Sequence, residues 1–154
     1  MKSFIGKLVF CAALAAPVAM AAETEDEVSL LFVEMSPNIT MADGTLTLTQ
    51  PDDQIIWFSD RPQRLAGQVS TADFLEAWTN GPDSFQEDPP NATLFGKTEG
   101  GEMATVVTIS NARKTENGVA FDYVLLEGEE QASWSDAALF IDGACWWTLI
   151  PICK

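Results

Sequence analysis

The sequence predicts a mainly β domain, similar to a β-sandwich, with about eight antiparallel strands and one short inserted helix over residues 71–79. Three observations indicate this class. Short apolar or alternating segments recur between turn-forming residues along the chain. Only one segment has both a helix start signal and a helical apolar face. No internal repeat or low-complexity linker divides the chain, so we expect a single domain over residues 22–154.

Residues 1–21 have the features of a secretory signal peptide. Lys2 and Lys7 form a basic start, residues 8–18 are mainly apolar, and residues 19–21 match a small-x-small cleavage pattern. The apolar stretch is shorter than the roughly 20 residues that span a bilayer. A retained membrane anchor is the alternative. We expect cleavage, no membrane span in the mature chain, and a location in the periplasm or outside the cell.

The mature chain is strongly acidic. It carries 6 basic and 23 acidic residues, a net charge of −17. Such a surface repels phosphate backbones and anionic membranes, so we expect no nucleic-acid partner. Solubility is the simplest role for this acidity, and a cationic partner is the alternative.

The first half of the mature chain contains four expected strands. Residues 28–33, apolar except for Ser29, are typical of a buried strand, and residues 45–49 alternate strictly between leucine and threonine. Residues 55–58 are apolar on both faces, which is typical of a covered strand. Residues 65–69 suggest a short fourth strand, and residues 38–44 are expected to be a loop.

The helix expected over residues 71–79 begins at a capping box. Ser70 and Asp73 are spaced so that their side chains satisfy the first free N–H groups. One apolar face is formed by Phe74, Leu75 and Trp78, which we expect to pack on the sheet. An Asn-Gly-Pro sequence then ends the helix.

The second half contains a hairpin within residues 103–127. A two-residue loop centred on Asn117 and Gly118 would place the apolar faces of its strands on opposite sides of the sheet. A three-residue loop over residues 116–118 makes the faces agree, so we expect this loop with Gly118 in the left-handed conformation. Two further strands are expected over residues 137–142 and 146–152, the second forming a strand or tail.

Two cysteines remain after signal cleavage, Cys145 and Cys153. An even pair in an oxidising compartment predicts a disulfide bond. In a straight strand the two would lie about 26 Å apart, whereas a disulfide needs Cα atoms within about 7 Å. The bond therefore requires a chain reversal between residues 146 and 152. The alternative is free thiols or pairing between molecules.

The sequence lacks the side chains on which most catalytic sites depend. It has no histidine, which excludes Ser-His-Asp and Cys-His arrangements and most zinc and copper sites. Glycine-rich phosphate loops and calcium-loop patterns are also absent. We therefore expect no cofactor and no metal. A carboxylate-based hydrolase is the alternative, although a solvated acidic face explains the same candidates, which are Asp60, Asp83, Glu87 and Asp88.

Residues 57–64 are the strongest candidate site, because they contain two of the three arginines of the chain. Asp60, Arg61 and Arg64 follow an apolar strand that ends in Trp57 and Phe58. One interpretation is that an arginine pairs with an internal acid and fixes a corner of the fold. The other is an anion-binding site formed by Asp60, Arg61 and Arg64 beside an aromatic wall.

Five tryptophans suggest carbohydrate binding as a further possibility. Trp57 and Trp78 fit core positions in the expected strand and helix. Trp146 and Trp147 are adjacent and would point to opposite faces of an extended chain, so at least one of them is a candidate for contact with a protein or carbohydrate partner.

The chain resembles a family of small secreted bacterial proteins of unknown function. The shared pattern runs FSDRP-x-R, a short helix with a tryptophan, GP-x-SF and DPPNA, which here covers residues 58–64, 73–78, 81–85 and 88–92. The resemblance implies a shared fold and no established activity. The tail from Gly143 onward departs from the pattern.

Together these observations predict an exported non-catalytic domain that acts as a binding or envelope-associated module. The first alternative is a carboxylate-based hydrolase with a site near Asp60, Arg61 and Asp88. The second is an interaction protein that uses the tail with Trp146 and Trp147.

Overall fold

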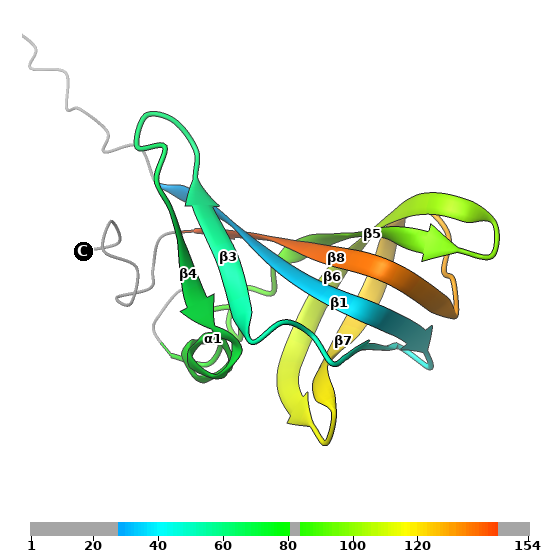
Figure 1. Ribbon diagram of the computed structural model, residues 1–154. Helices are drawn as coiled ribbons and strands as arrows, with labels where there is room; N and C mark the ends of the chain where they lie inside the picture. Colours follow the sequence, from blue (N-terminus) through cyan, green and yellow to red (C-terminus); the bar gives the residue numbers. More distant parts are fainter. Residues whose placement is uncertain (1–27, 81–83, 145–154) are drawn as a thin grey trace, which may run out of the picture.

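The computed structural model describes residues 28–80 and 84–144, which form eight strands and one short helix (Figure 1). The elements in chain order are β1 Ser29–Ala42, β2 Thr45–Thr49, β3 Gln54–Ser59, β4 Ala66–Ser70, α1 Thr71–Ala77, β5 Asn91–Thr98, β6 Gly101–Thr115, β7 Gly118–Glu127 and β8 Ser133–Ala144. All strand pairs are antiparallel. The expected mainly β class, with eight antiparallel strands and one short helix, is confirmed.

The eight strands belong to one sheet with the order β2-β7-β6-β5-β8-β1-β3-β4. Because β2 also pairs with β1, six of these strands close into a ring formed by β1, β2, β7, β6, β5 and β8. The β3–β4 hairpin continues the sheet beyond β1 and lies outside this ring. Each ring strand therefore has a neighbour on both sides over at least part of its length.

Strand β1 changes partner along one of its edges. Its residues 30–33 pair with β3 and its residues 38–42 pair with β2, while β8 follows the other edge. The expected loop over residues 38–44 is therefore wrong. Ile39 and Met41 are buried in alternation, so the strand continues, and only Asp43 and Gly44 form the turn. Both have positive φ angles, 50° and 74°, as a tight β-hairpin turn requires.

The turn between β6 and β7 also differs from the expectation. Thr115 pairs with Gly118, so the loop contains two residues rather than three. Gly118 is not in the left-handed conformation. Instead, a Cβ atom at Gly118 would collide with the backbone carbonyl of Leu48 in β2. The glycine is needed for close approach of two backbones.

The apolar faces of β6 and β7 nevertheless agree, because a bulge corrects the register. Arg113 pairs with Ala120, whereas Ser110 pairs with Asp122. Between these pairs β6 has one residue more than β7. This extra residue shifts the register by one, so that the apolar side chains of the two strands lie on the same face of the sheet. The sequence pattern indicated correctly that the faces agree, but it assigned the correction to the turn.

Strand β5 was not expected from the sequence. It lies between β6 and β8 and buries Ala92, Leu94 and Gly96 in alternation. The expected strand over residues 146–152 lies outside the described residues, as do the signal segment and the predicted Cys145–Cys153 disulfide. The number of strands matches the expectation, although their identities differ at these two places.

Helix α1 packs its apolar face against the core, as expected. The Ser70 Oγ accepts a hydrogen bond from the Asp73 N–H at 3.1 Å and donates one to the Asp73 carboxylate at 2.6 Å. Phe74 and Trp78 are buried, and the Trp78 ring packs at a tilt against those of Phe85 and Phe121, with centroid distances of 4.9 and 5.5 Å. The helix ends two residues before the expected position 79. No helix in the described ranges is long and apolar enough to cross a bilayer.

Candidate functional site

The predicted arginine site lies at one end of the β3–β4 hairpin. Residues 60–65 join the two strands, and we call them the hairpin tip. All six are exposed, and the tip lies at the opposite end of the hairpin from α1 (Figure 1). The pairing of β3 with residues 30–33 of β1 fixes the hairpin to the rest of the sheet.

Backbone hydrogen bonds hold the tip in place. The Ser59 N–H donates to the Leu65 carbonyl at 2.8 Å, and the Leu65 N–H donates to the Ser59 hydroxyl at 2.9 Å. The Arg64 N–H donates to the Asp60 carbonyl at 3.1 Å, and Arg64 has a φ angle of 50°. The Arg61–Pro62 peptide bond is cis. The tip is therefore a defined turn of the chain.

Within residues 28–80 and 84–144, neither Arg61 nor Arg64 forms an ion pair or a side-chain hydrogen bond. The Asp60 carboxylate instead accepts a hydrogen bond from the Arg61 backbone N–H at 2.7 Å. The expected pairing of an arginine with an internal acid is thus not found in this part of the chain. Both arginines are exposed.

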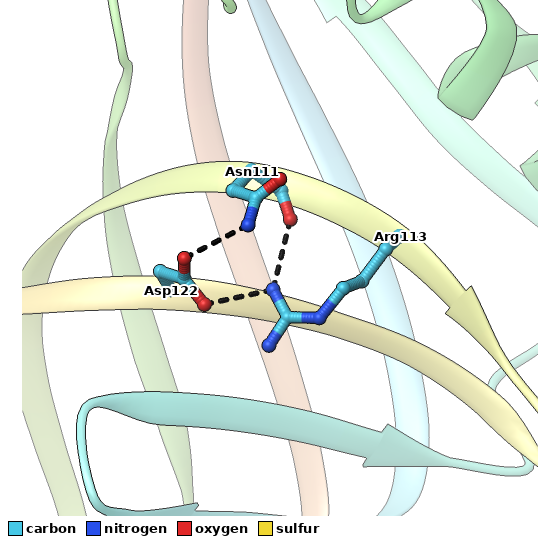
Figure 2. A network of polar contacts seen from close by, with 3 residues as sticks. All are labelled: Asn111, Arg113 and Asp122. Atoms are coloured by element: carbon cyan, nitrogen blue, oxygen red, sulfur yellow. Dashed lines mark hydrogen bonds and ion pairs between the residues drawn. The ribbon is translucent and has the colours of Figure 1, made fainter.

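The third arginine shows what a structural arginine does in this protein. The Arg113 guanidinium donates to the Asp122 carboxylate at 2.7 Å and to the Asn111 carbonyl at 3.0 Å (Figure 2). Asn111, which has a φ angle of 52°, donates from its side chain to the same carboxylate at 2.9 Å. These hydrogen bonds, first from Asn111 and then from Arg113, lower the pKa of Asp122. Together they tie the β6 bulge to β7.

The aromatic wall predicted beside the arginines is only partly present. Trp57 is in the core, and its ring covers Gly67, where an added Cβ would lie 2.6 Å from the ring. Phe58 lies on the other face of β3 and is 40% exposed, and Leu65 in the tip is 44% exposed. Phe58, rather than Trp57, is thus the aromatic side chain on the solvent side of this hairpin.

A pocket of about 420 Å³ lies at the other end of the hairpin. The β2–β3 connection, the first turn of α1 and the β6–β7 turn line this pocket, which contains Lys114 and Leu75. The Thr71 hydroxyl and N–H donate to the carbonyls of Asp52 and Asp53, both at 3.0 Å, and hold two of the walls together. Each wall was recognisable as a turn or a helix start in the sequence, but no pattern showed that the three meet.

Three of the four acids proposed for a hydrolase lie among the described residues. Among the described residues, no hydrogen bond joins Asp60, Glu87 and Asp88, and none of the three lines the pocket. The N–H groups of Glu87 and Asp88 both donate to the Ser84 carbonyl at 2.9 Å, in a local turn. Asp83 lies outside the described residues. The structure therefore gives no support to a pair of carboxylates facing Arg61.

Glu34 is a buried carboxyl that the sequence analysis missed. Its side chain is fully buried in β1, and neither carboxylate oxygen has a hydrogen-bond partner among the described residues. Burial raises the pKa of Glu34 to about 8. Leu30, Phe32 and Glu34 occupy alternate positions of β1, so the two-residue period of a strand could have placed Glu34 on the buried face.

The chain matches no protein-family model, and comparisons with curated proteins and with solved structures give no match.

Proposed function

We propose that the protein is an exported, non-catalytic binding module that recognises an anionic group of its partner through Arg61 and Arg64. One observation carries this proposal. The two arginines are exposed and lack acid partners among the described residues, as does Lys114, whereas Arg113 and Lys97 are paired with acids. An export signal and an acidic, histidine-free sequence agree with a binding role outside the cytoplasm.

The charge of the molecule limits which anions are suitable. With a net charge of −17, the mature chain repels an extended polyanion over a long range. A single carboxylate can still approach an exposed tip and accept paired hydrogen bonds from a guanidinium group. The backbone N–H of Arg61 already engages the Asp60 carboxylate. The proposed ligand group is therefore one carboxylate rather than a chain of phosphates.

A protein partner is favoured over a carbohydrate. The rings of Trp57, Trp78 and Trp134 are buried and cannot stack on a sugar. Phe58 and Leu65 supply exposed apolar surface on the hairpin, which suits a peptide side chain. Trp146 and Trp147 lie outside the described residues, and a role for them stays a prediction.

The proposal can be tested by an NMR titration of the mature chain that follows the arginine Nε–Hε signals. The probes are a short peptide with a free C-terminal carboxylate, the same peptide as its amide, and oligogalacturonate as an acidic saccharide. The carboxylate peptide should shift the signals of Arg61 and Arg64 and leave that of Arg113 in place. Equal shifts of all three arginines would indicate general charge screening and would contradict the proposal.

The double variant Arg61→Gln, Arg64→Gln should weaken binding of the carboxylate peptide by at least about tenfold, because a charge-assisted hydrogen bond contributes roughly 1.5–3 kcal/mol. Lys97→Gln is the matched control, since it removes a cation that is already paired with Asp136 at 2.8 Å. Unchanged affinity in the arginine variant would rule out the tip as the binding site. A response to oligogalacturonate alone would exclude the protein partner.

A further inference from the structure

Strand β4 forms one edge of the described sheet. It pairs with β3 only, and no other described strand covers its outer side. Its sequence, Ala-Gly-Gln-Val-Ser, contains no charge, no proline and no bulge. Exposed edges in soluble proteins are usually protected by such features, because free N–H and C=O groups invite pairing with another strand.

The register shows which backbone groups face outward. The Ser59 N–H donates to the Leu65 carbonyl and the Thr71 N–H donates to the Asp53 carbonyl, so the odd-numbered residues of β3 and β4 form the hydrogen-bonded pairs. In an antiparallel ladder these pairs alternate with non-hydrogen-bonded pairs. Gly67 and Val69 therefore bond to β3, whereas the N–H and C=O groups of Ala66 and Gln68 point away from it.

The surface beside this edge is apolar. Phe58 pairs with Ala66 and Ile56 pairs with Gln68, and both β3 side chains are exposed, at 40% and 37%. Side chains on one face of neighbouring strands stabilise one another when they are apolar. An extended segment on β4 would thus find backbone partners at its edge and an apolar face next to it.

The hairpin tip lies directly before β4 in the chain and carries Arg61 and Arg64, which lack acid partners in the described part of the chain. These two cations favour a negatively charged group on any segment that binds beside this end of β4. A second copy of the protein would bring a further net charge of −17 to the edge, which disfavours self-pairing. A peptide from another protein, with one carboxylate placed at the tip, avoids this repulsion.

We infer that β4 accepts an extended peptide segment of a partner protein as an additional strand, with a carboxylate of that segment bound by Arg61 and Arg64. The segment has apolar side chains at alternate positions, facing Phe58 and Ile56. Strand addition takes its affinity from main-chain hydrogen bonds and its selectivity from alternate side chains. This inference rests on the proposed function and names the partner and the geometry of binding.

The test begins with a library of random octapeptides displayed with free C-termini and selected against the mature protein. The selected peptide is then synthesised with a free carboxylate and as its amide. Hydrogen exchange of the wild-type chain is followed residue by residue with and without the peptide. We expect the amides of Ala66 and Gln68 to exchange at least about tenfold more slowly in the complex. The amides of Gly67 and Val69 serve as internal controls, since they are already bonded to β3.

A variant tests the same edge by a second route. Gln68→Pro removes one outward N–H without removing a bond to β3, which a strand edge tolerates. We expect it to reduce peptide affinity at least about tenfold, while Gln68→Ala retains binding. The exchange measurement uses the unaltered chain, so it remains decisive if Gln68→Pro fails to fold.

The outcomes separate this inference from the proposed function. Protection of Ala66 and Gln68, with weaker binding of the amide peptide and of the Arg61→Gln, Arg64→Gln variant, supports both. An arginine response without protection of the edge overturns strand addition and leaves the proposed function standing. Edge protection that is equal for both peptides and both proteins overturns the role of the arginines and keeps strand addition. Protection that rises with protein concentration alone, or a selection that yields no peptide, overturns the inference.

Discussion

At the scale of single residues, the most unusual group is the Glu34 carboxyl. It lies in the stretch of β1 where the strand leaves β3 and joins β2, and it follows Phe32 on the buried face. Next on this face is Ser36, whose hydroxyl donates to the carbonyls of Asn38 and Thr49 at 2.8 and 2.9 Å. The serine finds partners in the described structure and the carboxyl does not. Glu34 is therefore neutral in the folded protein at pH 7.

This neutrality makes stability depend on pH. The pKa of Glu34 rises on folding from its ordinary value of 4.5 to about 8. The folded chain therefore binds more protons than the unfolded chain between these values, and stability falls as pH rises through this window. Below 4.5 the contribution is fully present, and above about 8 it is lost. The difference amounts to roughly 5 kcal/mol as an upper limit.

Glu34→Gln should flatten this dependence, because the amide does not ionise. We expect the variant to be more stable than the wild type by several kcal/mol at about pH 9 and similar to it at about pH 5. Urea unfolding at both pH values measures the difference. Glu99→Gln, at an exposed position in the β5–β6 turn, is the control and should follow the wild type. Parallel curves for the wild type and Glu34→Gln would contradict the assignment of the effect to this carboxyl.

At the scale of elements, close backbone contact between β2 and β7 depends on Gly118. An alanine there would place its Cβ against the Leu48 carbonyl, which is backbone and cannot swing aside. We expect Gly118→Ala to cost about 3 kcal/mol in the free energy of unfolding. Gly100→Ala is the matched control, because its Cβ would meet only Thr98 Oγ1 at 3.6 Å, an ordinary contact. Equal stability of the two variants in urea would show that β2 can move away.

The β6 bulge provides a second test at this scale. Asn111 adopts a left-handed conformation that β-branched residues avoid, and its side chain bonds to Asp122. Asn111→Val should destabilise the fold by about 1–3 kcal/mol through backbone strain and loss of that bond. Asn111→Gly removes the bond but accepts the conformation, so it should cost less. Thermal unfolding of both variants ranks them, and the reverse order would rule out strain as the main cause.

Features that depend on residues close together in the sequence were predicted correctly, whereas features that depend on distant contacts were not. The capping box at Ser70 and Asp73 predicted the start of α1 correctly, since both partners lie within one turn of helix. The turn at Gly118 was misassigned because the glycine is required by close contact with β2, a strand about 70 residues earlier in the chain. The chain turns at Arg61 and Arg64, as the sequence predicted, but whether acids pair with these arginines depends on tertiary contacts. The pocket depends on three segments meeting and had no sequence signature.

At the scale of the whole molecule, the ring and the hairpin should differ in local stability. The ring strands pair on both sides, whereas the β3–β4 hairpin is attached through four residue pairs between β1 and β3. We expect the amides of Gly67 and Val69 to exchange through a lower-energy opening than those of Val107 and Ile109 in β6. Native-state hydrogen exchange in increasing urea measures both. A single shared opening energy would mean that the hairpin and the ring unfold together.

The partner change in β1 has an evolutionary consequence. The chain from β3 to α1 lies in sequence between β2 and β5, yet the ring of the other six strands closes without it. No strand pairing within the ring involves a residue of this segment, although its loss would remove the core side chains Ile55, Trp57, Val69, Phe74 and Ala77. Selection could therefore reshape the hairpin tip and the β4 edge while the scaffold stays constant. Among descendants of this chain, we expect lineages to diverge first between residues 54 and 77.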